Sequence, residues 1–581
     1  MTRLLSPVFA AFLLSACAAQ PELPEIASEP APTPPVTESP ELALPERAIP
    51  ADSLYPLLLA EFALRRRAYD VALEQYTEQA PLLRDAGISA HTTHLTQFMQ
   101  EEERALEAVQ LWVELEPENT EARNTLATLL VRDGRSWEAL PHLAELQRLG
   151  GRANFPILAH GFKDLTSEQQ AQMAARLDAL GTEFPDDAQL LLAQALVHTE
   201  LGNTGIALQR LDQVLEIEPE RSEAMLLEAR LLLEQGKRKP FARIDRALAA
   251  EPTNTRLRLQ YARILTRHDM AAAREQFEVL SAQSPNDADL LFSLALINQD
   301  MGDRLTARAY LTQLLELGER ENDANFYLGR IAEEEGDLKL ALKHYMKVTE
   351  GREFLAANSR VGDILMSSGQ FSQSRVYFRA LRARYPGMAE RLYALEADLL
   401  GQAGQLQASV DLLTLALADL PDSYSLRYAR SMALEQQDEL ELMEQDLRAI
   451  IDNDPENATA LNALGYTLAD RTDRIDEAQD LIARALALEP EEPAILDSMG
   501  WVLYRQGQLE ESLVYLRRAY QRFPDPEVAA HLGEVLWVKG DREEALEIWR
   551  EALEDDPEHE VLLSTLERFG LSDMAPATAA Q

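Results

Sequence analysis

The side chains that could do chemistry are few in this chain and lie far apart in its sequence. Of the nine histidines only His91 and His94 are close, and no acidic residue completes a metal-binding motif with them. The chain has no phosphate-binding GxxxxGK[ST], dinucleotide-binding GxGxxG or nucleophile-bearing GxSxG sequence. Neighbouring carboxylates such as Asp555 and Asp556 fall in helix ends and turns that we expect to be solvated. The sequence therefore predicts a protein that is not an enzyme, with no catalytic residue, metal or cofactor.

The single cysteine offers a different chemistry, which is covalent lipid attachment. Residues 1–16 hold one basic residue and then an apolar run that ends in small residues, as is typical of a secretory signal. The LSAC sequence that ends at Cys17 resembles the bacterial lipobox, which implies that signal cleavage leaves Cys17 as a lipidated N-terminus. By the sorting rule of such lipoproteins, Ala18 implies the outer membrane of a Gram-negative bacterium, facing the periplasm. An ordinary signal peptide with an incidental cysteine is the alternative.

The charge of the chain is strongly negative but unevenly distributed. Lys and Arg total 55 against 98 Asp and Glu, a net charge of −43, which repels nucleic acid and anionic lipid. Residues 237–274 are an exception, because ten basic residues there outnumber three acidic ones, for a local charge of +7. This basic island is either a solvated face that pairs with acidic neighbours or a docking patch for an acidic partner. Its candidate binding residues are Lys237, Arg238, Lys239, Arg243, Arg246, Arg256, Arg258, Arg263 and Arg267.

The elements that must position these side chains recur with a fixed period. Prolines recur 33 to 35 residues apart, or at multiples of that spacing, at positions 117, 185, 219, 252, 285, 386, 421, 455, 490, 524 and 557. Within the last period the residue types follow a pattern of small, aliphatic and aromatic positions: Leu532, Gly533, Leu536, Gly540, Ala545, Trp549, Ala552 and Pro557. Period and pattern resemble the tetratricopeptide repeat (TPR), a helix-turn-helix unit. The sequence therefore predicts an all-α superhelical solenoid of stacked TPR hairpins.

Four aromatic residues fall on the first helix of a predicted repeat, at positions that usually face the groove of a TPR array. They are Tyr466, Trp501, Tyr504 and Trp537, and aromatic side chains are favoured anchors for a protein partner. For Trp501 and Trp537, groove and core are equally plausible positions. Trp549 falls on the consensus core position. The position after the consensus glycine holds no Asn in the clearest repeats, so the carboxylate clamp of chaperone-type TPR domains is not expected.

The chain divides by composition and by the clarity of the repeat. We predict a lipoprotein signal peptide at 1–16, a lipid-anchored Pro-rich flexible linker at 17–51, degenerate TPR-like repeats at 52–185, a regular TPR array at 186–557, a capping helix at 558–570 and a disordered tail at 571–581. A linker of this composition reaches roughly 100 Å at about 3.1 Å per residue. The folded part can then act far from a bilayer.

Three phrases in the C-terminal repeats, NALGYTLADRT, LDSMGWVLYRQG and AAHLGEVLWVKGD, resemble those of large proteobacterial TPR lipoproteins. With the lipobox, linker and length, the chain resembles the outer-membrane lipoprotein adaptor of the CtpA-type carboxyl-terminal processing protease. That resemblance implies a non-enzymatic scaffold that binds a periplasmic protease and presents peptidoglycan hydrolases to it, with no small-molecule substrate. One alternative is an assembly lipoprotein for a secretin, pilus or outer-membrane protein. An envelope enzyme with an appended TPR array is less favoured, because repeats occupy nearly all of 52–570.

Overall fold

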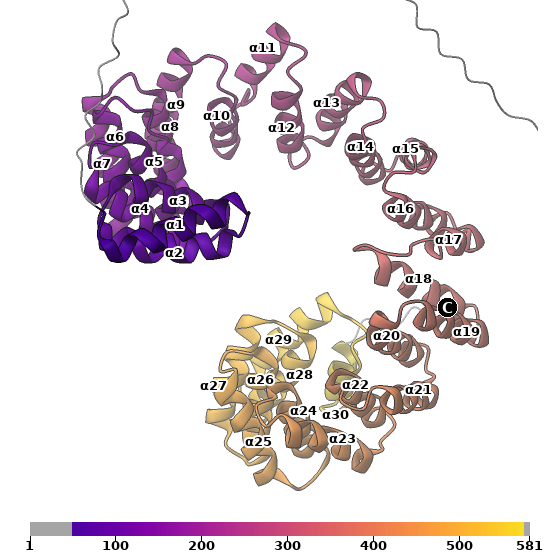
Figure 1. Ribbon diagram of the computed structural model, residues 1–581. Helices are drawn as coiled ribbons and strands as arrows, with labels where there is room; N and C mark the ends of the chain where they lie inside the picture. Colours follow the sequence, from indigo (N-terminus) through magenta and orange to yellow (C-terminus); the bar gives the residue numbers. More distant parts are fainter. Residues whose placement is uncertain (1–48, 575–581) are drawn as a thin grey trace, which may run out of the picture. The chain divides into compact units, whose positions relative to one another are not determined.

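A computed structural model describes residues 49–574 of the chain, and the predicted all-α fold is confirmed for them (Figure 1). This range contains thirty α-helices and four short 3-10 helices, and no strand. It divides into two compact units, of which the first ends at Ala224 and the second begins at Met225. The predictions for the signal peptide, for Cys17, for the linker up to residue 48 and for the last seven residues lie outside the described range.

The first unit consists of helical hairpins, in which each helix packs on the next one along the chain. Between α6 and α7, where the sequence departs from the repeat, the 3-10 helices η1 (Phe155–Ala159) and η2 (Phe162–Asp164) bury two phenylalanines in the core. The α-helices of this unit are α1 (Ala51–Arg65), α2 (Tyr69–Leu83), α3 (Ala86–Phe98), α4 (Glu102–Leu115), α5 (Thr120–Arg132), α6 (Ser136–Arg148), α7 (Ser167–Glu183), α8 (Ala188–Glu200) and α9 (Thr204–Ile217).

The second unit continues the hairpins, and α10 (Ser222–Glu234) contains the boundary between the units. The first half of its further helices is α11 (Ala242–Ala250), α12 (Thr255–Leu265), α13 (Met270–Gln283), α14 (Ala288–Asp300), α15 (Arg304–Leu317), α16 (Glu321–Glu334), α17 (Leu338–Tyr345), α18 (Phe354–Ser367), α19 (Phe371–Arg384) and α20 (Ala389–Gln402). The second half is α21 (Leu406–Asp419), α22 (Tyr424–Glu435), α23 (Leu440–Asn453), α24 (Ala458–Arg471), α25 (Ile475–Leu488), α26 (Pro493–Arg505), α27 (Leu509–Arg522), α28 (Pro526–Lys539), α29 (Arg542–Asp555) and α30 (Glu560–Arg568). The short helices η3 (Pro386–Met388) and η4 (Ser572–Met574) complete it.

Within the second unit, the first helix of each hairpin lies on the inner side of a curved row. Figure 1 shows α12, α14, α16, α18 and α20 along the inner edge and α13, α15, α17, α19 and α21 outside them. In the later repeats successive inner helices contact each other directly, as α18 does with α20 and α24 with α26. Where inner helices are in contact, the faces that they turn away from the outer helices therefore form one continuous surface.

Small residues allow the two helices of a hairpin to approach closely. A Cβ atom on Gly533 of α28 would lie 2.1 Å from Nε1 of Trp549 on α29, and one on Gly465 would lie 2.6 Å from the Ile482 side chain. Trp549 is 0% exposed, which confirms its predicted place in the core. At the end of α28, Gly540 has φ of +109°, a backbone conformation that favours glycine and turns the chain into α29. The sequence period thus encodes both the turns and the packing.

Candidate partner-binding surfaces

The inner helices of the C-terminal repeats bring together acidic side chains and aromatic rings, which we call the inner cluster. Its members lie on three successive inner helices, and several are in contact although they belong to different repeats. They are Tyr466 and Asp470 on α24, Asp497, Trp501 and Tyr504 on α26, and Glu527, His531 and Glu534 on α28.

His531 is the centre of the inner cluster and is only 3% exposed. Its Nδ1 atom lies 2.8 Å from Oδ2 of Asp497, and its ring stacks on the indole of Trp501 with 4.2 Å between centroids. Burial lowers the pKa of His531, but the charge and hydrogen bond of Asp497, with the fields of Glu527 and Asp470, outweigh it and raise the pKa above its ordinary value. The folded structure therefore favours the charged form of His531, which makes a buried ion pair with Asp497.

Tyr466 connects repeats that are two apart in the sequence. Its hydroxyl donates a hydrogen bond of 3.0 Å to Oε1 of Glu527 and lies 3.4 Å from Nε2 of His531. Burial raises the pKa of the Tyr466 hydroxyl, with Glu527 and other carboxylates acting in the same direction, so the group remains a donor. Because 61 residues separate Tyr466 from Glu527, this bond shows that α24 and α28 converge across α26.

Trp501 supports the inner cluster from below its surface. The indole is 4% exposed, and its Nε1 donates a hydrogen bond of 3.1 Å to Oδ1 of Asp470 on α24. The structure thus places Trp501 in packing, where it holds His531 and Asp470 in position. Its ring offers little area to a partner.

Tyr504 and Trp537, the remaining predicted anchors, lie toward the C-terminal end of the array. The hydroxyl of Tyr504 donates to Oε1 of Glu534 at 3.0 Å, and burial raises the pKa of Tyr504 to about 12. Trp537 is half-buried and packs between Trp549, at 5.8 Å, and Phe569, at 6.1 Å between ring centroids. Trp537 therefore mainly stabilises the last repeat.

The solvent-accessible side of the inner cluster is formed by half-buried carboxylates. Burial raises the pKa of Glu435 on α22. The charge of Arg471 lowers this pKa, whereas the charges of Asp470 and Glu527 raise it further. The carboxylates of Asp470 on α24 and Glu527 on α28 thus both act on Glu435 of α22. Their summed field makes this inner face attractive to cationic side chains.

The inner cluster is suited to binding and offers no catalytic arrangement. His531 is hydrogen bonded by Asp497 on one edge, lies against the Tyr466 hydroxyl on the other and is covered by the indole of Trp501. Its ring therefore presents no free nitrogen to a substrate. Across residues 49–574, no group of three or more His, Cys, Asp or Glu side chains is arranged to hold a metal ion. No helix in that range is both long and apolar enough to cross a bilayer.

The structure separates the predicted basic island into paired and unpaired members. Arg243 is half-buried and its Nε lies 3.0 Å from Glu228, and Arg246 donates to the backbone oxygen of Ala242. The prediction must be corrected for Arg258, which is 8% exposed and whose guanidinium donates to Gln276 and to the backbone oxygen of Pro252. The members that are exposed, with no carboxylate within 4.0 Å in the described part of the chain, are Lys237, Arg238, Lys239, Arg246, Arg256, Arg263 and Arg267.

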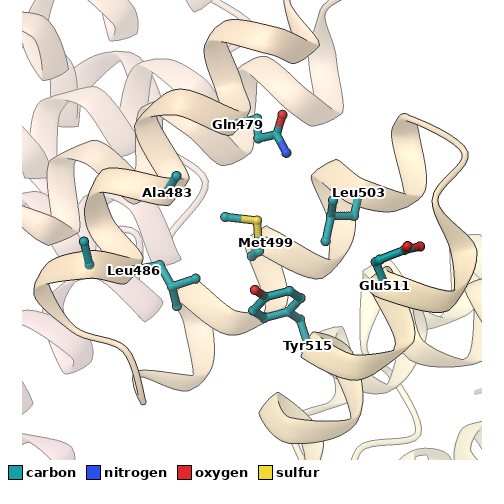
Figure 2. A pocket seen from close by; sticks show the side chains of 8 residues that line it. Gln479, Ala483, Leu486, Met499, Leu503, Glu511 and Tyr515 are labelled. Atoms are coloured by element: carbon teal, nitrogen blue, oxygen red, sulfur yellow. The ribbon is translucent and has the colours of Figure 1, made fainter.

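Sequence reasoning missed a groove on the other side of the C-terminal repeats (Figure 2). It has a volume of about 490 Å³ and lies between α25 and α27, with Met499 and Leu503 of α26 between them. Ala483 is a small residue on one wall, and the ring of Tyr515 stands on the opposite wall. Small residues on the outer helix α25 were a signal for this groove in the sequence. Alanine occurs on nearly every helix of the described chain, however, so this signal does not distinguish α25 from the others.

A second surface that the sequence did not reveal lies on α1. Four large apolar side chains of this helix are exposed, although they follow a helical spacing that would ordinarily be buried: Leu54, Tyr55, Leu58 and Phe62. The opposite face of α1 packs on α2 through Ala60 and Ala63. The first unit thus presents an apolar face at its N-terminal end.

The comparisons with known proteins agree with this architecture. The profile of the tetratricopeptide repeat matches residues 192–239, 292–352, 467–527 and 498–560. The protein belongs to the TPR repeat-containing proteins. A relative is the TPR repeat-containing protein PA4667 of Pseudomonas aeruginosa, which is 37% identical over 510 residues, covering 86% of this chain and 85% of that protein. Its name describes repeats and no enzymatic activity.

Solved TPR structures are similar only in part. A thermophilic TPR protein of Thermus thermophilus is 18% identical with a TM-score of 0.29, covering 32% of this chain and all of that one. A TPR protein of Parabacteroides merdae is 13% identical with a TM-score of 0.34, and the match covers 43% of this chain and 98% of that one. The Cut9-Hcn1 hetero-tetramer of the APC/C gives 14% identity and a TM-score of 0.32, covering 89% and 96%.

Proposed function

We propose that this protein is a non-enzymatic scaffold of the bacterial envelope that binds protein partners. In this proposal it holds peptidoglycan hydrolases for a periplasmic carboxyl-terminal processing protease, as the resemblance to that protease's lipoprotein adaptor implies. A long row of hairpins can bind two partners at once, so that the encounter between them is governed by effective concentration. Cleavage chemistry then belongs to the protease, and the scaffold contributes position.

The observation that carries the proposal is the convergence of carboxylates on the inner face of the second unit. Glu435, Asp470 and Glu527 come from three different inner helices, yet Asp470 and Glu527 both act on the carboxylate of Glu435. Enzymes that bind anionic envelope polymers tend to be basic. An acidic inner face in a chain of net charge −43 would steer such enzymes toward the array and raise their association rate.

The proposal includes attachment to the outer membrane through lipid on Cys17. Acyl chains contribute about 0.8 kcal/mol per buried CH₂, and several chains on one cysteine would anchor the protein firmly. A Cys17→Ala variant should leave the membrane fraction and retain its fold. If that variant still sediments with the outer membrane, the anchoring argument fails.

Affinity capture tests the scaffold function. The full chain carrying Cys17→Ser is immobilised and exposed to an envelope extract, and bound proteins are identified by mass spectrometry. We expect both a serine protease and at least one peptidoglycan hydrolase to be enriched. Enrichment of neither would refute the scaffold function, and hydrolytic activity of the purified chain alone would refute its non-enzymatic character.

A pair of matched variants tests the role of the inner face. Neutralising Glu435 and Glu527 to Gln should reduce hydrolase capture, because it removes two charges from the proposed surface. Neutralising Glu543 and Glu547, which are exposed on the outer helix α29, changes the net charge equally and should leave capture unaltered. Equal losses from both variants would mean that only the total charge matters.

A further inference from the structure

Three unpaired arginines of the basic island form an ordered stripe along α12 and the turn that follows it. Arg256, Gln260 and Arg263 are exposed at spacings of four and three residues, and Arg267 continues the same line in the turn after the helix. At 3.6 residues per turn these positions lie on one face. The opposite face of α12 is buried through Leu257, Tyr261 and Leu265 among others, so the stripe points away from the core. We call these three arginines the α12 stripe.

The neighbouring inner helix extends the α12 stripe. Arg230 on α10 precedes Arg263 by 33 residues, which is also the spacing between Pro219 and Pro252. The two arginines therefore occupy equivalent positions on successive first helices of hairpins, and Arg230 is likewise exposed. Positions that correspond in adjacent repeats face the same side of a TPR array.

The α12 stripe makes no ion pair within residues 49–574, although this chain is rich in carboxylates. Elsewhere in the second unit exposed arginines pair with acids of an adjacent repeat, as Arg304 does with Glu334 and Arg474 with Glu444. The stripe thus leaves its guanidinium groups open to an external anion.

We propose that the α12 stripe, together with Arg230, binds an acidic polypeptide segment of a protein partner. A guanidinium offers donors in a planar fork that matches a carboxylate, and successive arginines along one helix face suit an extended chain of Asp and Glu. This inference rests on the proposed scaffold function, to which it adds a second surface of opposite charge to the inner cluster. Two partners of opposite character could then be held on one array.

A polypeptide fits the stripe better than an anionic membrane does. The stripe belongs to α12, a first helix that lies on the inner edge of the curved row of the second unit (Figure 1). A flat bilayer meets projecting surfaces, whereas a peptide can lie along an inner helix. The net charge of −43 also repels an anionic bilayer over a wide area, and this repulsion acts less on a narrow peptide.

The test measures fluorescence anisotropy of a labelled oligoglutamate peptide with the full Cys17→Ser chain at about 0.15 M salt. The stripe variant carries Arg256→Glu, Arg263→Glu and Arg267→Glu. The control variant carries Lys237→Glu, Arg238→Glu and Lys239→Glu, which change the net charge equally in the exposed loop before α11. We expect a loss of about tenfold or more in affinity for the stripe variant and less than about threefold for the control. All six positions are exposed, so both variants should fold, and circular dichroism checks this.

Three results would overturn the inference. Equal losses in both variants would show that only the regional charge matters, and no binding by the native chain would remove the site. Stripe-dependent binding to phosphatidylglycerol vesicles, without binding to oligoglutamate, would assign the stripe to a membrane surface. If the stripe variant misfolds, the substitutions Arg256→Gln and Arg263→Gln replace it. The stripe variant should still capture hydrolases through the inner cluster. A failure of the stripe to bind oligoglutamate can therefore be told apart from a failure of the scaffold function.

Discussion

The buried pair of His531 and Asp497 gives the sharpest test of how the inner cluster is held together. Replacing His531 by Phe preserves a flat ring against Trp501 but leaves the Asp497 carboxylate without its partner. The side chains of His531 and Asp497 are 4% and 9% exposed, so water cannot fully compensate. Removing one partner of a buried ion pair typically costs about 3–5 kcal/mol. We expect a loss of that size in the local stability of α26 and α28.

The pH dependence of the same pair follows from the direction of the pKa shift. The folded-state pKa of His531 is raised above its unfolded value of about 6.5, so the stabilisation is fully present below that pH. As the pH rises from about 6.5 through the folded-state pKa, the free energy of unfolding should fall by at most about 1.4 kcal/mol per pH unit. Over this range the folded state holds one proton that the unfolded state has released. The carboxylates of Asp497, Glu527 and Asp470 raise the pKa of the ring, and the Tyr466 hydroxyl lies against its Nε2.

Native-state hydrogen exchange is the appropriate assay, because a solenoid unfolds in parts and a single unfolding temperature averages over them. Amide protection on α26 and α28 is compared for the native chain, His531→Phe, and the double variant Asp497→Leu with His531→Phe. We expect the double variant to recover much of the lost stability, since it buries no unpaired charge. A loss below about 1 kcal/mol in His531→Phe, with no pH dependence in the native chain, would refute the ion-pair interpretation.

Two further predictions concern packing in the second unit. Gly533→Ala should destabilise the last repeats by about 1–3 kcal/mol in denaturant unfolding, because the added Cβ would overlap a buried indole. The control is Gly401→Ala in α20, where the added Cβ meets no neighbour within 4 Å. This variant should be neutral or stabilise by up to about 1 kcal/mol. Arg382→Met should lower the free energy of unfolding by about 3–5 kcal/mol, because Glu396 is 1% exposed and accepts a hydrogen bond of 2.5 Å from Nη1 of Arg382. Adding Glu396→Met should recover stability, since no unpaired charge is then buried. If it does not, the buried ion pair is not the cause of the loss.

The fold could be predicted from the sequence because its determinants are local and repeat. Pro557 ends one hairpin, Gly540 permits the turn within it and Gly533 allows its helices to approach, and each of these acts within one period. A wrong interpretation at one position is corrected by the same position in the other repeats. The period therefore carries the architecture even where single repeats, such as the one between α6 and α7, depart from it.

The inner cluster could be predicted only in part, because its contacts depend on how tightly the repeats are wound. Tyr466 was identified as a groove residue, but its bond to Glu527 crosses 61 residues and needs α24 and α28 to converge. His531 had no partner in its own neighbourhood, since Asp497 lies 34 residues earlier. That separation equals one repeat, and it was the available indication. Residues one period apart face each other on adjacent inner helices, and searching for acid and histidine pairs at that spacing would have found this pair.

Two surfaces of opposite charge can act in one chain only if salt separates their fields, and this leads to a last prediction. At about 0.01 M salt the screening length is about 30 Å, so the net charge of −43 reaches the α12 stripe and repels an acidic peptide. At about 0.15 M salt the screening length falls to about 8 Å, so the nearby arginines Arg256, Arg263 and Arg267 dominate the field that the peptide meets. At about 1 M salt the screening length is about 3 Å, and the attraction of these arginines is screened as well. Oligoglutamate affinity, followed by anisotropy across this range, should therefore pass through a maximum. Binding of oligolysine to the inner cluster should instead weaken steadily as salt rises. A steady fall for both peptides would mean that the stripe never experiences the charge of the rest of the chain.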